Sequence, residues 1–291
     1  MGPFRVTVSR GSVVEAVHRV HAVAVQDGRI VDAAGDPQLV TFYRSSSKPI
    51  QALPLARERP DVTDVELAIA CASHRATEAQ VAAAASLLAK APATEDDLEC
   101  GPQEGRGPSR LAHNCSGKHA GFLAVCRARG WPLDGYRLPD HPLQQLLLDE
   151  VAGAAELRRD QIATAVDGCG VLTFALTLER MAHSFARLAR LDGGERIAAA
   201  MTAHPELIGY EHGANDTELM RARPGWIAKG GAEGLICAGS PDGLGIALKV
   251  EDGAMRGLRP ALAKLVGLPE EWGTVAIENS RGEQVGEVAL A

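Results

Sequence analysis

A serine and a lysine three positions apart are the first residues in this sequence that could do chemistry together. They are Ser45 and Lys48, in the segment RSSSKP. On a helix, residues i and i+3 share a face, so the amine can lie beside the hydroxyl. A neutral amine can take the hydroxyl proton and make the serine a nucleophile. Lowering a lysine pKa to 7 requires about 4.6 kcal/mol from burial or a nearby cation. A serine-rich helix cap beside a solvated lysine is the alternative interpretation.

A second lysine follows a predicted strand, in the segment Lys229-Gly230-Gly231. This pattern is similar to the Lys-Thr-Gly strand of acyltransferases that carry an SxxK serine. In that role Lys229 would depress the pKa of Lys48 and bind a developing oxyanion or a substrate carboxylate. The glycines would let substrate approach the backbone. A glycine-rich strand end with an exposed lysine is the alternative.

Ser73, His74 and Arg75 stand together before another predicted helix. Ser73 could relay protons, and His74 or Arg75 could grip a carboxylate. The same three residues are also compatible with an ordinary helix start, and their spacing alone does not decide between the two interpretations.

Thiols, amines and imidazoles gather in two further segments. HNCSGKH, residues 113–119, is predicted to start a helix, and DGCG, residues 167–170, forms a glycine-flanked turn. Two thiolates and a third ligand could hold Zn2+ with an open fourth position. The spacing matches neither CxxC nor HExxH pairs, so two alternatives stay open. Cys169 could be a nucleophile paired with His119, or the cysteines could be buried and inert.

Strand patterns at both ends of the chain surround a helical middle. Alternation over residues 4–9 and 21–25, with turns at Gly11 and Asp27-Gly28, predicts an antiparallel meander. Helical periodicity runs from Lys48 to about Arg223. Strands return over residues 226–229, 234–238 and 244–250, before a helix over 255–266 and a hairpin over 274–290 that turns at Arg281-Gly282.

Two patterns locate helices within the middle of the chain. Thr77 and Gln80 form a capping-box pattern that opens a helix ending at Lys90. Apolar residues form one stripe, which should face the core, along a helix that begins near Leu172. The stripe consists of Phe174, Leu178, Met181, Phe185 and Leu188.

These patterns predict an α+β architecture, in which an antiparallel sheet built from both termini carries a helical insert. Residues 1–291 would form a single domain of two lobes. The sheet lobe would span about residues 1–44 and 225–291, and the helical lobe about 45–224. The groove between the lobes would be the natural pocket.

Composition narrows the partners and the location. A net charge of -7 and a pI near 5.7 argue against nucleic-acid and anionic-membrane partners and favour small soluble substrates. No segment approaches the roughly 18 apolar residues that span a bilayer, and the N-terminus lacks a signal-peptide pattern, which predicts a cytoplasmic location. There, six cysteines are more often buried, catalytic or metal-bound than paired. Only six of the 30 Lys and Arg residues are Lys, which favours lysines kept as deprotonatable amines.

Ordered motifs between about Tyr43 and Val250 resemble the asparaginase family typified by the inducible, thermolabile rhizobial L-asparaginase. This family is distinct from the bacterial threonine-dependent asparaginases. The motifs are YRSSSKPIQALPL, CASHRATEAQ, CGPQEG, HNCSGKHAGFLAVC, DGCGVLTFALTLERMA and KGGAEG. The resemblance implies the fold of serine β-lactamases and glutaminases, in agreement with the architecture expected from the strand and helix patterns.

The resemblance also implies roles for individual residues. The SxxK pair falls on Ser45 and Lys48, and a second catalytic pair falls on Ser73 and Lys229. The family's metal site falls on Cys115, Lys118 and Cys169, where Zn2+ would orient substrate or hold the helical lobe without being required for bond breaking. Substrate-binding and surrounding positions fall on Arg44, His74, His119 and Asp167. A homodimer is the expected assembly.

The expected activity is hydrolysis of L-asparagine to L-aspartate and ammonia through an acyl-enzyme on Ser45. A glutaminase or broader amide hydrolase is the first alternative, because one methylene is worth only about 1 to 3 kcal/mol in a pocket. A non-catalytic protein that binds zinc or an amino acid is the second. β-Lactam hydrolysis is less expected, because no Ser-Asp-Asn motif lies between the two lysine motifs and Gly230 replaces the Thr of Lys-Thr-Gly.

Overall fold

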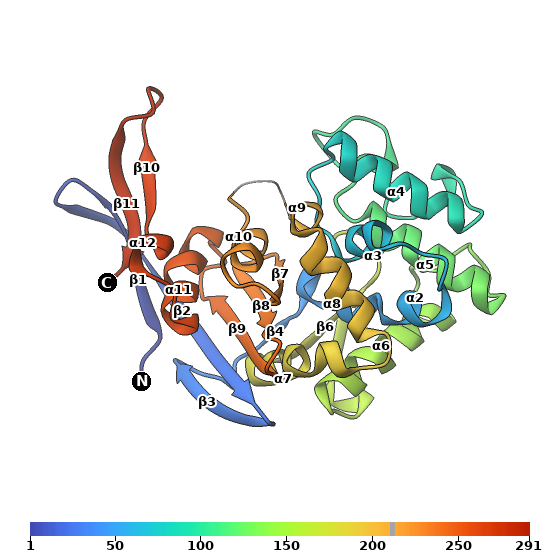
Figure 1. The fold of residues 1–291 in the computed structure, drawn as a ribbon, viewed down its shortest axis with the longest axis horizontal. Helices are drawn as coiled ribbons and strands as arrows, with labels where there is room; N and C mark the ends of the chain where they lie inside the picture. The colour runs from blue at the N-terminus through green and yellow to red at the C-terminus, as the bar shows by residue number, and fades with distance from the viewer. Residues whose placement is uncertain (210–212) are drawn as a thin grey trace.

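A computed structural model describes residues 1–209 and 213–291, and it contains a large antiparallel sheet that both ends of the chain build together (Figure 1). The strand order is β10-β11-β1-β2-β9-β8-β7, and β3 pairs with β2 off this path. The sheet predicted from the two termini is therefore confirmed. Its strands are β1 (Phe4–Arg10), β2 (Val13–Gln26), β3 (Arg29–Ala34), β7 (Ile227–Gly231), β8 (Leu235–Gly239), β9 (Leu244–Val250), β10 (Val275–Glu278) and β11 (Gln284–Leu290).

Helices fill the middle of the chain. The capping box predicted at Thr77 and Gln80 is present and opens α4, and a second one, at Thr63 and Glu66, opens α3. The helices are α1 (Lys48–Gln51), α2 (Leu53–Glu58), α3 (Asp64–Cys71), α4 (Glu78–Lys90), α5 (Ser116–Arg129), α6 (Pro142–Ala155), α7 (Leu178–Arg187), α8 (Gly194–Ala203), α9 (Pro205–Ile208), α10 (Asn215–Ala222), α11 (Leu258–Val266) and α12 (Glu270–Gly273). Short 3-10 helices are η1 (Arg44–Ser47), η2 (Glu95–Asp97), η3 (Arg110–Ala112), η4 (Arg159–Gln161), η5 (Leu188–Arg190) and η6 (Met255–Gly257).

The helix predicted to begin near Leu172 is wrong at its start. Residues 172–177 form β6 (Leu172–Thr177), the centre of a small sheet with β4 (Val40–Phe42) and β5 (Ala163–Val166). Thr177 then caps α7 by accepting a hydrogen bond from the Arg180 backbone. A short apolar run fits a strand and a buried helix equally well, so periodicity could not separate them. The expected stripe is nevertheless core, because Phe174 in the strand is as buried as the helical members.

Helices cover both faces of the sheet where β9 runs. Gly245 faces α7, since a Cβ there would lie 1.9 Å from the Ala182 carbonyl oxygen, a distance that excludes any side chain. Val250 lies on the opposite face of the strand. It contacts η6, where a Cβ on Gly257 would lie 3.2 Å from Val250 Cγ1. Burial on both faces explains why β7, β8 and β9 are almost continuously buried.

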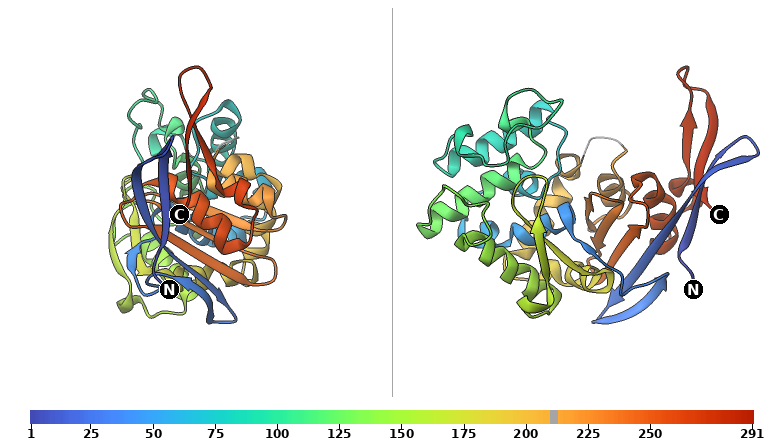
Figure 2. Two further views of the ribbon diagram at one scale, coloured as in Figure 1. Left: turned by 90° about the vertical axis from the view of Figure 1, so that its left-hand side faces the viewer. Right: turned by 180° about the vertical axis from the view of Figure 1, so that it is seen from behind.

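The sheet and the helices α2 to α6 occupy opposite ends of the molecule (Figures 1 and 2). Both chain termini lie at the sheet end, and β7, α9 and α10 lie where the two parts meet (Figure 1). Within the described residues, no helix has the length and apolar character needed to cross a bilayer. The elements that carry the chemical motifs therefore meet at the junction between sheet and helices.

Candidate active site

The segment that holds the SxxK pair begins with a strained turn. Arg44 has a φ of 48°, in the left-handed region that costs a residue with a side chain about 1 to 2 kcal/mol. Two contacts hold it there: its backbone N–H donates to Thr173 Oγ1 at 3.2 Å, and its Nε donates to Asp167 Oδ1 at 2.8 Å. The turn leads into η1 and α1, and Ser45 reaches a cavity wall.

Strand β7 is joined directly to η1, which brings two distant motifs together. Ser46 Oγ donates to the Lys229 carbonyl oxygen at 2.8 Å. A Cβ on Gly231 would lie 2.9 Å from Ser46 Oγ and 3.2 Å from the Tyr43 carbonyl oxygen, so this approach requires glycine. Gly231 also lines the cavity. The glycines of this motif thus serve the contact between the motifs as well as the approach to the cavity.

The Lys48 amine is buried behind the cavity, with only 1% of the residue exposed. It donates hydrogen bonds to the Ala72 carbonyl oxygen and to Ser73 Oγ, the latter at 3.1 Å. Burial is the main cause that lowers the pKa of Lys48; Cys115 and Cys169 oppose it, and the charges of Lys118 and Lys229 add to it. The solvated lysine of the alternative interpretation is wrong. The Lys48 amine thus bonds to Ser73 and not to Ser45, the serine of its own motif. Within residues 1–209 and 213–291, Ser45 Oγ makes no hydrogen bond.

Lys229 is equally buried and is paired with a carboxylate that sequence reasoning missed. Its Nζ lies 3.3 Å from Asp216 Oδ2 and donates to the Gly230 carbonyl oxygen at 2.7 Å. Asp216 Oδ2 also accepts from the Gly230 backbone at 2.9 Å. The exposed-lysine alternative is therefore wrong as well. Nothing local marks Asp216 in the sequence, because it resembles any acidic residue in the first turn of a helix.

Ser45, Ser73 and Lys229 line one cavity of about 520 Å³. This volume lies in the range of small-molecule sites. Its walls come from both parts of the fold: Ser73 follows α3, Asp216 begins α10, and Arg259 extends from α11. Ser45 and Ser73 offer hydroxyls, and Lys229 offers a positive charge. An amide carbonyl in this cavity could meet a nucleophile and a cation together.

The four predicted substrate-binding residues do not lie on this cavity wall. Arg44 and Asp167 form the ion pair that holds the strained turn. His74 is buried, with Nε2 2.9 Å from Ser116 Oγ, and burial lowers its pKa to about 3, so it is neutral. His119 Nδ1 lies 2.6 Å from the Tyr136 hydroxyl. The cavity wall instead carries other polar residues: Arg75, Arg106, Asn114, Asn215 and Asp216.

The three predicted metal ligands lie together, next to that ion pair. Lys118 Nζ is 3.0 Å from Cys169 Sγ, and Cys115 shares a hydrogen bond with Cys169. This bond and the Lys118 charge lower the pKa of Cys169, although burial opposes ionisation. Burial also opposes charge on Lys118, but the two sulfurs raise its pKa above the usual range. These opposite shifts favour a charged pair of Lys118 and Cys169 beside Cys115.

The donor chemistry of this cluster suits Zn2+. Two sulfurs and an amine are available, and the buried His119 Nε2 lies beside Cys169. Among the residues described, no three His, Cys, Asp or Glu side chains are spaced to hold a metal, so the set depends on Lys118. All six cysteines are free and buried. Cys169 does not line the cavity, which disfavours it as a nucleophile.

A family model described as L-asparaginase II matches residues 6–290. No curated protein sequence matches the chain. A solved structure of a protein named Mglu, in its native form, has a TM-score of 0.51 and 16% identity over 86% of this chain and 65% of that longer chain. The same protein in 4.3 M NaCl gives 0.50 and 16%, over 86% of this chain and 61% of that one.

A β-lactamase from Mycobacterium bovis has a TM-score of 0.45 and 16% identity, over 85% of this chain and 93% of that chain. At such identities the two Mglu structures show the fold alone. The Mglu structures share the α+β fold, with its antiparallel sheet and helices, that the strand and helix patterns predicted.

Proposed function

The chain belongs to the L-asparaginase II family and is an amidohydrolase, and from that premise we propose that it hydrolyses L-asparagine to L-aspartate and ammonia through an acyl-enzyme on Ser45. One observation carries the proposal. A buried lysine amine with a lowered pKa stands behind a cavity lined by two serine hydroxyls and a second lysine. A serine activated by a neutral amine, with a cation opposite, is suited to acyl transfer.

In the first step Lys48 accepts the Ser45 proton. A neutral amine has two hydrogens and one lone pair; the hydrogens are used on the Ala72 carbonyl and on Ser73, so the lone pair remains to accept from a hydroxyl. Ser45 Oγ then attacks the side-chain amide carbon, forming a C–O bond. The Lys229 ammonium stabilises the developing oxyanion. The lowered pKa of Lys48 supports its role as the base at neutral pH.

In the second step the C–N bond breaks and ammonia leaves. The proton taken by Lys48 passes through Ser73, 3.1 Å away, to the departing nitrogen, and Lys229 remains beside Ser73 on the cavity wall as the fixed cation of this relay. Water then attacks the Ser45 ester, with Lys48 again accepting a proton, and aspartate is released.

Cys115, Lys118 and Cys169 would hold Zn2+, with His119 beside them. A bound zinc ion would act as a Lewis acid and would require Lys118 in its neutral form. Because these residues lie off the cavity wall, their proposed role is to hold α5 against the β5–β6 loop, whose Asp167 supports the Arg44 turn. The bond-breaking steps use the chain's own side chains.

Replacing the nucleophile tests this mechanism. We expect Ser45→Ala to lose ammonia release from saturating asparagine by a factor of about 10³ or more. Ser73 is the second candidate, because it rather than Ser45 bonds to Lys48. Mass spectrometry of the wild type quenched during turnover should find the added aspartyl group on Ser45. An acyl group on Ser73, with activity retained by Ser45→Ala, would reverse the two assignments.

Comparing amides separates the proposal from its rivals. A higher kcat/KM for L-asparagine than for L-glutamine is expected, and the opposite order would make the enzyme a glutaminase. Calorimetry that finds asparagine bound but never consumed would support a non-catalytic binding protein. A cytoplasmic site of action is part of the proposal, supported by six free thiols, which persist in reducing compartments. Subcellular fractionation tests it.

A further inference from the structure

We propose that Arg106, with Arg75 beside it, forms the subsite that binds the α-carboxylate of the amino-acid amide. This inference rests on the proposed function and deepens it, because it names the residues that would distinguish an amino acid from a simple amide. Both arginines line the cavity that contains Ser45 and Ser73.

The Arg106 guanidinium is held next to the catalytic serines by the backbone. Its Nη1 donates to the His74 carbonyl oxygen at 2.8 Å and to the Ala112 carbonyl oxygen at 3.2 Å. His74 directly follows Ser73, which bonds to the Lys48 amine. The backbone N–H of His74 in turn donates to the Asn114 carbonyl oxygen at 3.2 Å. A carboxylate bound here would therefore lie near Ser73, in the cavity that Ser45 also lines.

The charge of Arg106 is not neutralised by a carboxylate of the described residues. Both of its hydrogen bonds end on neutral carbonyls, and it forms no ion pair within residues 1–209 and 213–291. Burial and the Arg75 charge both lower the pKa of Arg106, and both arginines line the same cavity. Two guanidiniums on one cavity wall, in a chain of net charge -7, provide the planar donors that carboxylates prefer.

Two other arginines of the cavity are less suited to this role. Arg256 donates to His18 Nε2 at 2.9 Å, and His18 Nδ1 lies 2.6 Å from Asp252, so this cation already belongs to a chain that ends in a carboxylate. Arg259 donates to the Trp272 carbonyl oxygen at 2.8 Å and stacks over its ring. Both come from the η6–α11 segment, whereas Arg75 lies two residues after Ser73 and Arg106 bonds to the His74 carbonyl. Arg259 therefore provides a matched control within the same cavity.

A pair of amides that differ only in the α-carboxylate tests the proposal. Steady-state ammonia release is measured for L-asparagine and for 3-aminopropanamide, which is asparagine without that group. Wild type should prefer asparagine in kcat/KM. For Arg106→Gln, the kcat/KM for asparagine should fall about tenfold to a hundredfold, mostly through KM, while that for 3-aminopropanamide should not change. Arg106→Lys should recover part of the loss, and Arg259→Gln should leave the preference intact.

The pattern separates recognition from folding. If Arg106→Gln only disturbed the loop, both amides would lose equally, and that result would overturn the proposal. The proposal would also be overturned if Arg106→Gln kept the wild-type preference for asparagine over 3-aminopropanamide, or if Arg259→Gln lost that preference instead. Calorimetry makes the same comparison without turnover, because β-alanine is L-aspartate without its α-carboxylate. L-Aspartate should bind more tightly than β-alanine to wild type, but not to Arg106→Gln. If no amide is hydrolysed yet L-aspartate binds through Arg106, the proposed function fails while this inference stands.

Discussion

Three buried lysines meet around the site, and their neighbours put each one in a different state. Lys48 has a lowered pKa because it is buried among other cations and hydrogen-bonds to neutral groups. Lys118 has a raised pKa because, despite burial, it faces the sulfur of Cys169. Lys229 is paired with the Asp216 carboxylate. In the proposed mechanism, one side-chain type would thus supply a base, a partner for the Cys169 sulfur and a fixed cation.

Removing the charge of Lys229 should move the pH profile of the enzyme. Burial is the main cause of the lowered pKa of Lys48, and Lys229 contributes to it. In Lys229→Met that pKa should rise, so the base becomes neutral only at higher pH. The rising limb of kcat/KM against pH should shift to alkaline pH, and kcat should fall by about 10² to 10³ through loss of oxyanion stabilisation.

Lys264→Met, on the exposed side of α11, is the matched control and should leave the limb in place. The rising limb of kcat/KM against pH can be measured on the residual activity of Lys229→Met. If it does not shift, either Lys48 is not the base or Lys229 is not the cation that lowers its pKa.

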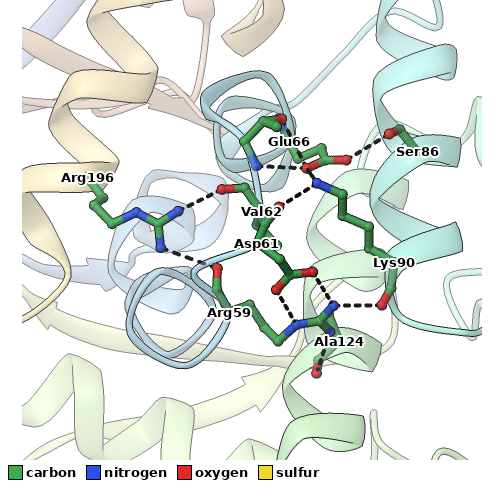
Figure 3. Close-up of polar contacts among 9 residues, drawn as sticks. Arg59, Asp61, Val62, Glu66, Ser86, Lys90, Ala124 and Arg196 are labelled. Atoms are coloured by element: carbon green, nitrogen blue, oxygen red, sulfur yellow. Dashed lines mark hydrogen bonds and ion pairs between the residues drawn. The ribbon is translucent and has the colours of Figure 1, made fainter.

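At the scale of elements, the position of α3 determines where Ser73 stands. The helix ends at Cys71, so the next two residues supply the carbonyl and the hydroxyl that bind Lys48. At its start, Glu66 accepts from the Thr63 backbone at 2.8 Å, from Ser86 at 2.7 Å and from Lys90 at 2.7 Å (Figure 3). Since Ser86 and Lys90 lie on α4, a single carboxylate connects two helices.

Glu66→Gln should lower the free energy of unfolding by about 2 to 4 kcal/mol at pH 7, because an amide cannot accept from all these donors. Burial opposes ionisation of Glu66, but the bonds from Lys90, Thr63 and Ser86 outweigh it and lower its pKa. The Glu66 carboxylate therefore stabilises the fold fully above its pKa in the unfolded chain, about 4.3. This stabilisation is lost as the pH falls through the lower pKa of Glu66 in the folded protein.

Urea unfolding at pH 7 and at pH 3 measures this difference. The difference in the free energy of unfolding between wild type and Glu66→Gln should be smaller at pH 3 than at pH 7. Glu78→Gln, at an exposed position in the first turn of α4, should differ little from wild type at either pH. An equal gap at both pH values would contradict the ionised state of Glu66.

At the scale of the whole molecule, the site exists because distant segments meet between sheet and helices. The serines come from the start and end of the α1–α3 segment, Lys229 comes from the sheet, and Asp216 comes from α10. The cluster of Cys115, Lys118 and Cys169 joins α5 to the β5–β6 loop. A metal there would cross-link segments about fifty residues apart in the chain.

Removing zinc should therefore reduce stability more than it reduces chemistry. After dialysis against a chelator, Tm should fall by about 5 to 10 °C, while ammonia release from asparagine at 25 °C is largely retained. Metal analysis of purified protein should find zinc in wild type but not in Cys169→Ala. The control is Cys126→Ala, which removes a buried thiol outside the cluster and should keep its zinc. An unchanged zinc content in Cys169→Ala would contradict the proposed ligand set. Complete loss of activity on chelation would mean that the metal takes a direct part in the reaction.

A homodimer remains a prediction that rests on the family. Light scattering after size-exclusion chromatography should give twice the 30.6 kDa mass of the chain. A mass of one chain at micromolar concentration would contradict it.

The sequence by itself determined the features that depend on local pattern. Strand alternation at both ends, the Thr77 capping box and the terminal hairpin are all present, because they depend on neighbouring residues. The reactive types of Ser45, Ser73 and Lys229 could also be recognised in the sequence, whereas their approach to one cavity depends on the fold. The short run at Leu172 was misjudged, because its pairing with β4 and β5 is not a local property.

Only the tertiary structure decided which groups face one another. That Lys48 binds Ser73, that Asp216 pairs with Lys229, and that Arg106 binds the carbonyl of His74 all depend on contacts between separate elements. The ion pair between Arg44 and Asp167, which supports the turn, is likewise a contact between separate segments. A pKa or an ion pair is set by burial and by charges that packing brings from elsewhere in the chain, and spacing along the sequence does not contain that information.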